Sequence, residues 1–112
     1  MTVIELGPSY ASLDDTDLEE AGAVLLSEAA TADPPLLVLD MSQTEFIGST
    51  FIELLVRAWK RIRQRGGHMV VCGLRPFCAE LLAITHLAAL WDTYPTREEA
   101  ATAILTHAEG RR

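Results

Sequence analysis

The stretch 36–74, LLVLDMSQTEFIGSTFIELLVRAWKRIRQRGGHMVVCGL, has two apolar runs on either side of a segment with helical spacing. The runs at 36–41 and 68–74 are rich in branched residues, which is typical of strands buried on both faces of a sheet. Between them, from Thr50 to Arg65, apolar side chains form one helical stripe: Phe51, Leu55, Trp59 and Ile62. The stretch therefore predicts a β-α-β unit with two parallel strands.

The rest of the chain continues this alternation. We expect a strand at 3–6, a helix at 14–32, a helix at 76–85, a strand near 90–93 and a helix from Thr96 to about 109. Thr96 and Glu99 match a capping box, which marks the start of the last helix. The order β-α-β-α-β-α-β-α predicts a small α/β fold, with a mostly parallel four-stranded sheet and helices packed on it. A length of 112 residues suits one domain, 1–112.

Charge is distributed unevenly along the chain. The net charge of −7 argues against nucleic acid as a partner. Residues 1–56 carry eleven acidic and no basic residues, whereas residues 57–112 carry nine basic and five acidic residues. An acidic face of this kind could steer a basic protein partner, or it could simply be solvated.

The cellular location of the protein is predicted from segments that the sequence does not contain. No apolar run is long enough to span a membrane, and the first residues do not resemble a signal peptide. The two cysteines, Cys72 and Cys78, are too few for a disulfide framework, so we expect reduced thiols and a cytoplasmic protein.

A search for catalytic or cofactor motifs finds none. There is no glycine-rich phosphate loop and no nucleophile elbow, so we expect neither an enzyme nor a cofactor. The histidines, His68, His86 and His107, are scattered, and the cysteines lack the neighbours that a zinc site needs. Asp40 ends the central strand, where it could cap the following turn.

Two hydroxyl residues, Ser49 and Thr50, follow the loop after the strand at 36–41. In open α/β sheets, sites form beyond the carboxyl ends of the strands, so these hydroxyls lie where a site is expected. One interpretation makes Ser49 the N-cap of the next helix, accepting a hydrogen bond from the N–H of Phe51 or Ile52. The other makes its hydroxyl functional, and residue chemistry alone leaves both open.

Several motifs taken together resemble the STAS domain of bacterial anti-sigma factor antagonists and of sulphate-transporter tails. Asp40-Met41-Ser42 stands for the family's D-L-S, and residues 46–51 stand for F-I-D-S-S-G. The later R-G-G, the apolar strand, the G-L-x-P turn and the L-W before the last helix follow in the family's order. The resemblance covers about residues 3–108 and implies the same small α/β fold.

This resemblance implies a non-enzymatic regulator that binds a serine-kinase anti-sigma factor. The kinase phosphorylates the regulator, and the phosphorylated regulator then dissociates from it. By position the acceptor is Ser49, with Thr50 as its neighbour or substitute. The partner-binding surface would consist of Asp40, Gly48, Ser49, Thr50 and Phe51. No metal and no membrane contact are implied, and the oligomeric state is left open.

Two positions depart from the family pattern. Gly48 replaces the aspartate before the acceptor, and Phe51 replaces the glycine after the hydroxyl pair. These changes keep two alternatives open: an unregulated STAS scaffold in a signalling complex, or a domain that binds a small ligand beside the helix start. If Phe51 is exposed it marks a contact patch, and if it is buried it belongs to the core stripe.

Overall fold

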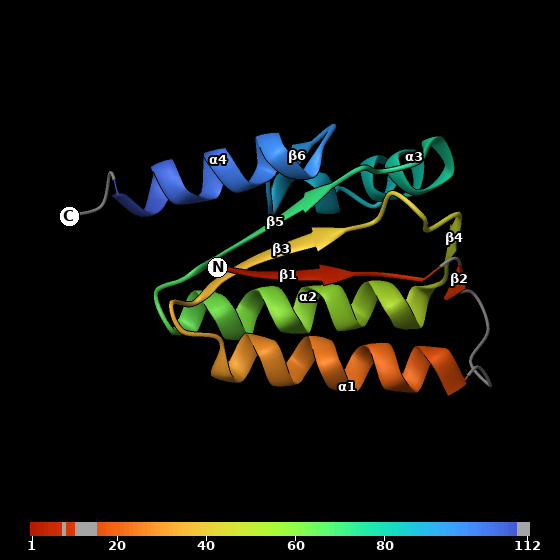
Figure 1. The fold of residues 1–112 in the computed structure, drawn as a ribbon. Coiled ribbons are helices and arrows are strands. Elements are labelled where there is room, and N and C mark those ends of the chain that lie inside the picture. Colours follow the sequence, from red (N-terminus) through yellow and green to blue (C-terminus); the bar gives the residue numbers. More distant parts are fainter. Residues whose placement is uncertain (8, 11–15, 110–112) are drawn as a thin grey trace.

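The computed structural model describes residues 1–7, 9–10 and 16–109. Figure 1 shows three layers, with a parallel sheet between helices on both of its faces. Helices α1 and α2 cover one face of the sheet and α4 covers the other, while α3 contributes Cys78 and Leu82 to the same cluster as α1 and α2. The main elements are β1 (Thr2–Glu5), α1 (Thr16–Thr31), β3 (Leu36–Asp40), α2 (Ser49–Gln64), β5 (His68–Cys72), α3 (Pro76–Ile84), β6 (Thr93–Tyr94) and α4 (Arg97–Glu109).

The four strands of the main sheet are all parallel, in the order β1-β3-β5-β6. The register places Val38 beside Val3 on one side and beside Val70 on the other. The predicted α/β fold and its order of elements are therefore confirmed. The carboxyl ends of the strands point toward the start of α2, as expected for the candidate site (Figure 1).

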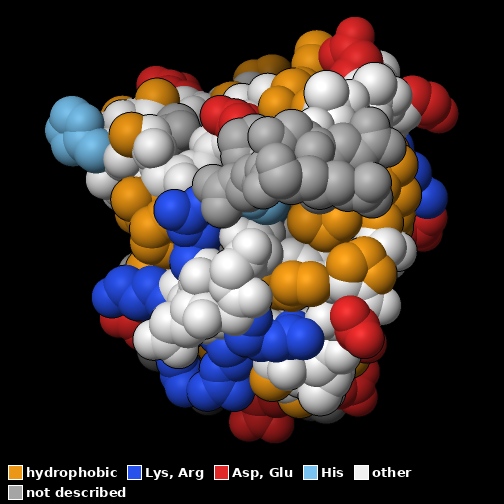
Figure 2. All heavy atoms as spheres, turned by 90° about the vertical axis from the view of Figure 1, so that its left-hand side faces the viewer, with side chains coloured by type: hydrophobic (Ala, Val, Ile, Leu, Met, Phe, Trp, Pro, Cys, Tyr) orange, Lys and Arg blue, Asp and Glu red, His pale blue; other side chains and the backbone are white. Residues whose placement is uncertain are grey.

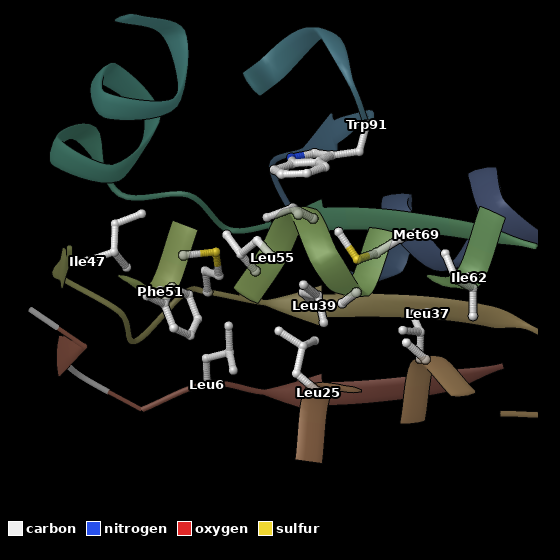
Figure 3. Close-up of a cluster of buried hydrophobic side chains, with 14 of the residues drawn as sticks. Leu6, Leu25, Leu37, Leu39, Ile47, Phe51, Leu55, Ile62, Met69 and Trp91 are labelled. Carbon is white, nitrogen blue, oxygen red and sulfur yellow. The ribbon is translucent and has the colours of Figure 1, made fainter. Parts of the chain in front are cut away.

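The sheet buries apolar side chains on both faces, as the unbroken apolar runs predict. The larger cluster lies between the sheet and α1 and α2, where Leu37 and Leu39 of β3 meet Leu25, Phe51 and Leu55 (Figure 3). A second cluster lies on the face that α4 covers: Leu36, Val38, Val70, Cys72, Ala100 and Ile104. Alternate residues of β3 thus belong to different clusters.

Two details differ from the expectation, and one cannot be compared with it. The last strand is Thr93–Tyr94 rather than 90–93, because a short 3-10 helix, η1 (Leu87–Ala89), precedes it after His86 at φ 62°. A second sheet pairs β2 (Ser9–Tyr10) with β4 (Phe46–Ile47). The first two residues of the helix expected at 14–32 lie outside the described part of the chain.

The last helix begins as the capping box predicts, since the Thr96 hydroxyl accepts a hydrogen bond from the N–H of Glu99 at 3.2 Å. The Glu53–Arg57 pair, which sequence spacing favours, forms no ion pair in the described chain. In the part of the chain that the structure describes, no helix is long and apolar enough to cross a membrane.

Candidate functional site: the start of helix α2

The segment before α2 is held in place by its own polar groups. Thr44 is fully buried, and its hydroxyl donates a hydrogen bond to the carbonyl of Gly7 at 2.7 Å. Its main-chain N–H donates to Met41 O at 3.0 Å, while the Cys78 thiol lies 3.6 Å from Thr44 O. The buried hydroxyl that donates to Gly7 helps to hold the loop in place, so β4 leads into α2 in a defined orientation.

Gly48, and not Ser49, is the N-cap of α2. Its backbone is extended, with φ −112° and ψ 179°, and its carbonyl accepts the N–H of Ile52 at 3.1 Å. No side chain caps the helix in the described structure. The interpretation of Ser49 as a cap is therefore wrong, because the helix begins one residue earlier than that interpretation requires.

Ser49 is the first residue of the helix and is exposed. Thr50 is half-buried and lines a shallow groove of about 380 Å³ between α1 and α2. Apolar side chains line most of this groove, including Leu18, Leu26 and Leu54. The two hydroxyls therefore differ in access: Ser49 is open to a second protein, whereas Thr50 faces the groove.

Phe51 is completely buried and belongs to the larger core cluster (Figure 3). It shares the inward face of α2 with Leu55, Ala58 and Ile62, as the helical stripe predicts. Its assignment to the partner-binding surface is wrong, because a side chain without exposed area cannot contact a partner.

Asp40 is engaged inside the molecule. Its side chain is 11% exposed; Oδ1 accepts the N–H of Ser42 at 2.9 Å, and Oδ2 accepts Nη2 of Arg97 at 2.7 Å. Arg97 also pairs with Glu5, so α4 is tied to the carboxyl ends of β1 and β3. The carboxylate thus bonds the following turn, which was one of its expected roles, and its place in the partner-binding surface stays a prediction.

The pKa of Asp40 is lowered by these contacts. Burial alone raises the pKa, but the hydrogen bonds from Ser42 and then the Arg97 guanidinium outweigh it, so the net shift is downward. A lowered pKa here reflects a structural ion pair rather than a proton donor for catalysis.

Sequence reasoning missed an exposed aromatic pair close to Ser49. The rings of Phe46 and Phe77 are 50% and 48% exposed and pack edge to face, with centroids 5.5 Å apart. An exposed ion pair between Arg75 and Glu45, at 2.8 Å, joins the same two segments. The fold brings together the ends of two loops here, which no spacing in the sequence reveals.

Two further features of the described residues bear on metal binding and thiol chemistry. Within that part of the chain, no group of three or more histidine, cysteine or acidic side chains could hold a metal ion. Both cysteines are free and buried, and burial raises the pKa of each thiol. The arrangement offers an exposed hydroxyl and an aromatic patch.

Comparison with known proteins gives a consistent result. The family model of the STAS domain matches residues 13–100. A candidate anti-sigma factor antagonist of Bordetella bronchiseptica, BtrV, is 30% identical over 70 residues. That alignment covers 62% of this chain and 60% of BtrV, so the chain matches less than two thirds of this relative's length.

Two solved structures have a similar fold. An anti-sigma-factor antagonist (STAS) domain protein from Planctomyces limnophilus superposes with a TM-score of 0.77 and is 36% identical. The superposition covers 92% of this chain and 89% of that one. An anti-sigma factor antagonist from Mycobacterium paratuberculosis gives a TM-score of 0.72 and 25% identity, with 91% of this chain and 83% of that chain covered.

Proposed function

Because this chain belongs to the STAS domain family, we propose that it acts as an anti-sigma factor antagonist switched by phosphorylation of Ser49. Its partner is an anti-sigma factor that is also a serine kinase, and the chain itself has no catalytic role. The observation that carries the proposal is the exposed hydroxyl of Ser49 on the first residue of α2. The names of its relatives supply the partner class.

The first turn of α2 suits a phosphate. The positive end of the helix dipole favours negative charge there, so a phosphate on Ser49 stabilises rather than unfolds the helix. The first turn carries no acidic residue of its own that would oppose it. The modification therefore leaves the fold intact.

The phosphate instead affects the interface with the anti-sigma factor. A doubly charged group that must be desolvated on binding weakens the complex. The aromatic pair Phe46 and Phe77 supplies the apolar centre of that interface, since exposed aromatic side chains are favoured anchors at protein contacts. Ser49 lies three residues after Phe46, so phosphate and anchor belong to one surface.

Incubation with the cognate kinase-type anti-sigma factor and ATP tests the switch. Mass spectrometry is expected to find one phosphate, on Ser49, and none on the Ser49→Ala variant. The Thr50→Ala variant is the matched control and should be phosphorylated like wild type. Modification at Thr50 alone, or at neither hydroxyl, would contradict the assignment.

Binding of the same partner tests the interface. Ser49→Asp and Phe77→Ala are each expected to weaken the complex about tenfold or more, measured by calorimetry. Exposed Arg57, near the middle of α2, provides a control, and Arg57→Gln should bind like wild type. If Ser49→Asp bound the anti-sigma factor as tightly as wild type, the proposed phosphorylation switch would be contradicted.

A second function, an unregulated STAS scaffold, is favoured by one observation. Gly48 stands where the resembling family carries an aspartate beside the acceptor. In that case the partner binds through the same aromatic patch, but Ser49 receives no phosphate. The two functions separate cleanly, because the scaffold loses binding in Phe77→Ala but not in Ser49→Asp.

A further inference from the structure

A cavity of about 230 Å³ lies at the far end of α2, away from Ser49. Arg63 on its wall follows Ser49 by fourteen helical positions, which corresponds to roughly 21 Å along the axis. Residues of α2, β5, β6 and α4 line it together with Leu90, Trp91 and Asp92. This cavity is therefore separate from the proposed phosphorylation site.

The cavity exists because the sheet is incomplete on this side. Strand β6 pairs with β5 only at Val71 and Cys72, so His68–Val70 have no neighbouring strand there in the described structure. The N–H of His68 bonds Pro35 O toward β3, and that of Val71 bonds Asp92 O toward β6. Strand residues alternate in direction, so the Met69 main chain faces the cavity.

Aromatic side chains form part of the cavity wall. The chain has two tryptophans, Trp59 and Trp91, and both line the cavity, as does Tyr94. A cavity of about 150 Å³ with apolar walls holds a benzene molecule. At about 230 Å³ this one has room for an aromatic ring and several further atoms.

The rim carries one charge of each sign. Arg63 and Asp92 both line the cavity and are both exposed, and no ion pair joins them. The Asp92 main chain is anchored to β5 through Val71, at 3.1 Å. Figure 2 views the molecule from this end, where basic side chains gather. A ligand with both a carboxylate and an ammonium group would satisfy both rim charges.

We propose that this cavity binds a free aromatic α-amino acid. The ring packs against Trp59 and Trp91, the carboxylate meets Arg63, and the ammonium group meets Asp92. The open main-chain edge of Met69 supplies a further donor and acceptor to the cavity. This binding is independent of the switch at Ser49.

Titration of the ¹⁵N-labelled chain with L-phenylalanine tests the proposal. Both indole N–H signals are expected to shift and saturate below about 10 mM, and tryptophan fluorescence should give the same dissociation constant. Two analogues remove one charge each: phenethylamine lacks the carboxylate, and 3-phenylpropionate lacks the ammonium group. Each should bind at least about tenfold more weakly.

Two variants on the same helix provide the matched comparison. Arg63→Gln should lose about tenfold or more in affinity, while Arg61→Gln, whose side chain does not line the cavity, should bind like wild type. Absence of saturation at about 10 mM, equal binding of 3-phenylpropionate, or equal loss in both variants would overturn the proposal. Ser49→Ala should bind phenylalanine unchanged, so this site and the switch can fail separately.

Discussion

Gly48 leaves the first turn of α2 without a side-chain cap, although its extended backbone suits any residue. Gly48→Asp would add a carboxylate that can accept a main-chain N–H of the first turn and that complements the helix dipole. We expect a gain of about 0.5 kcal/mol in the free energy of unfolding, measured by urea titration. Ser49→Ala is the control and should change stability by less than about 0.5 kcal/mol, because Ser49 caps nothing. A loss of stability in Gly48→Asp would contradict the assignment of Gly48 as the N-cap of α2.

The two thiols should be inert in the folded protein. Burial, followed by the charge of Asp40, raises the pKa of Cys72 to about 11, and burial raises the pKa of Cys78. At pH 8 both groups are therefore protonated and shielded, and the thiolate is the reactive form. A thiol-specific disulfide reagent should label neither cysteine in buffer and both in concentrated urea. Rapid labelling in buffer would show that the cluster around Cys72 opens readily.

At the scale of single residues, the sequence predicted which side chains are buried better than it predicted their functional roles. The spacing from Phe51 to Leu55 indicates an inward-facing side chain, and the structure confirms this burial. The contact role of Phe51 came only from its place in a motif. The pairing of Asp40 with Arg97 joins residues 57 positions apart, a contact that no local pattern contains.

The turn between α2 and β5 depends on two adjacent glycines for different reasons. A Cβ on Gly67 would lie 2.0 Å from the carbonyl oxygen of Pro35, which accepts the N–H of His68. Gly66 has open space around it but a left-handed φ of 76°. Gly67→Ala should therefore destabilise by more than about 2 kcal/mol, and Gly66→Ala by about 1 kcal/mol. Thermal and urea unfolding test the ranking, and the reverse order would contradict it.

Arg65 ties the end of α1 to α2. Its guanidinium donates to Ala29 O at 3.1 Å and to Ala32 O at 2.7 Å, which satisfies carbonyls that α1 leaves free. Arg65→Gln should lower the free energy of unfolding by about 1 kcal/mol, and Arg65→Lys should not restore it fully, because lysine lacks the planar fork. Arg61→Gln on the same exposed helix end should leave stability unchanged. An equal loss of stability in Arg61→Gln would indicate a general effect of removing positive charge instead.

At the element scale, long periodic segments were predictable and short ones were not. The helices and the strands β3 and β5 fall within a few residues of their expected bounds. The pair β2 and β4 has two residues in each strand, which is too short for an alternating pattern to show. The last strand is shifted because His86 adopts a left-handed conformation and η1 follows it.

Within the main sheet, the strands of the acidic half and those of the basic half of the chain form two separate pairs. The sheet order β1-β3-β5-β6 places both strands of the acidic half on one side and both strands of the basic half on the other. Arg97 of α4 joins them, because it reaches Glu5 and Asp40 at the ends of β1 and β3. The uneven charge visible in the sequence thus becomes a contact between the halves at the carboxyl end of the sheet.

This contact should make stability depend on pH in the acid range. The folded pKa of Asp40 is lowered from an unfolded value of about 3.9, so the unfolded chain binds a proton more readily between the two values. The contribution of Asp40 is therefore fully present above about pH 4 and is lost as the pH falls toward the folded pKa. Urea unfolding of wild type and Asp40→Asn at pH 7, 5, 4 and 3 measures it.

At neutral pH, Asp40→Asn is expected to be less stable by roughly 1–3 kcal/mol, because Arg97 and Ser42 lose a charged acceptor that is mostly buried. The difference between the two proteins should shrink as the pH falls through about 4, since wild type then carries a neutral carboxyl group as well. Glu80→Gln, on the exposed face of α3, should keep the pH profile of wild type. If the difference stayed constant down to about pH 3, the Asp40–Arg97 contact would not hold the two halves of the sheet together in solution.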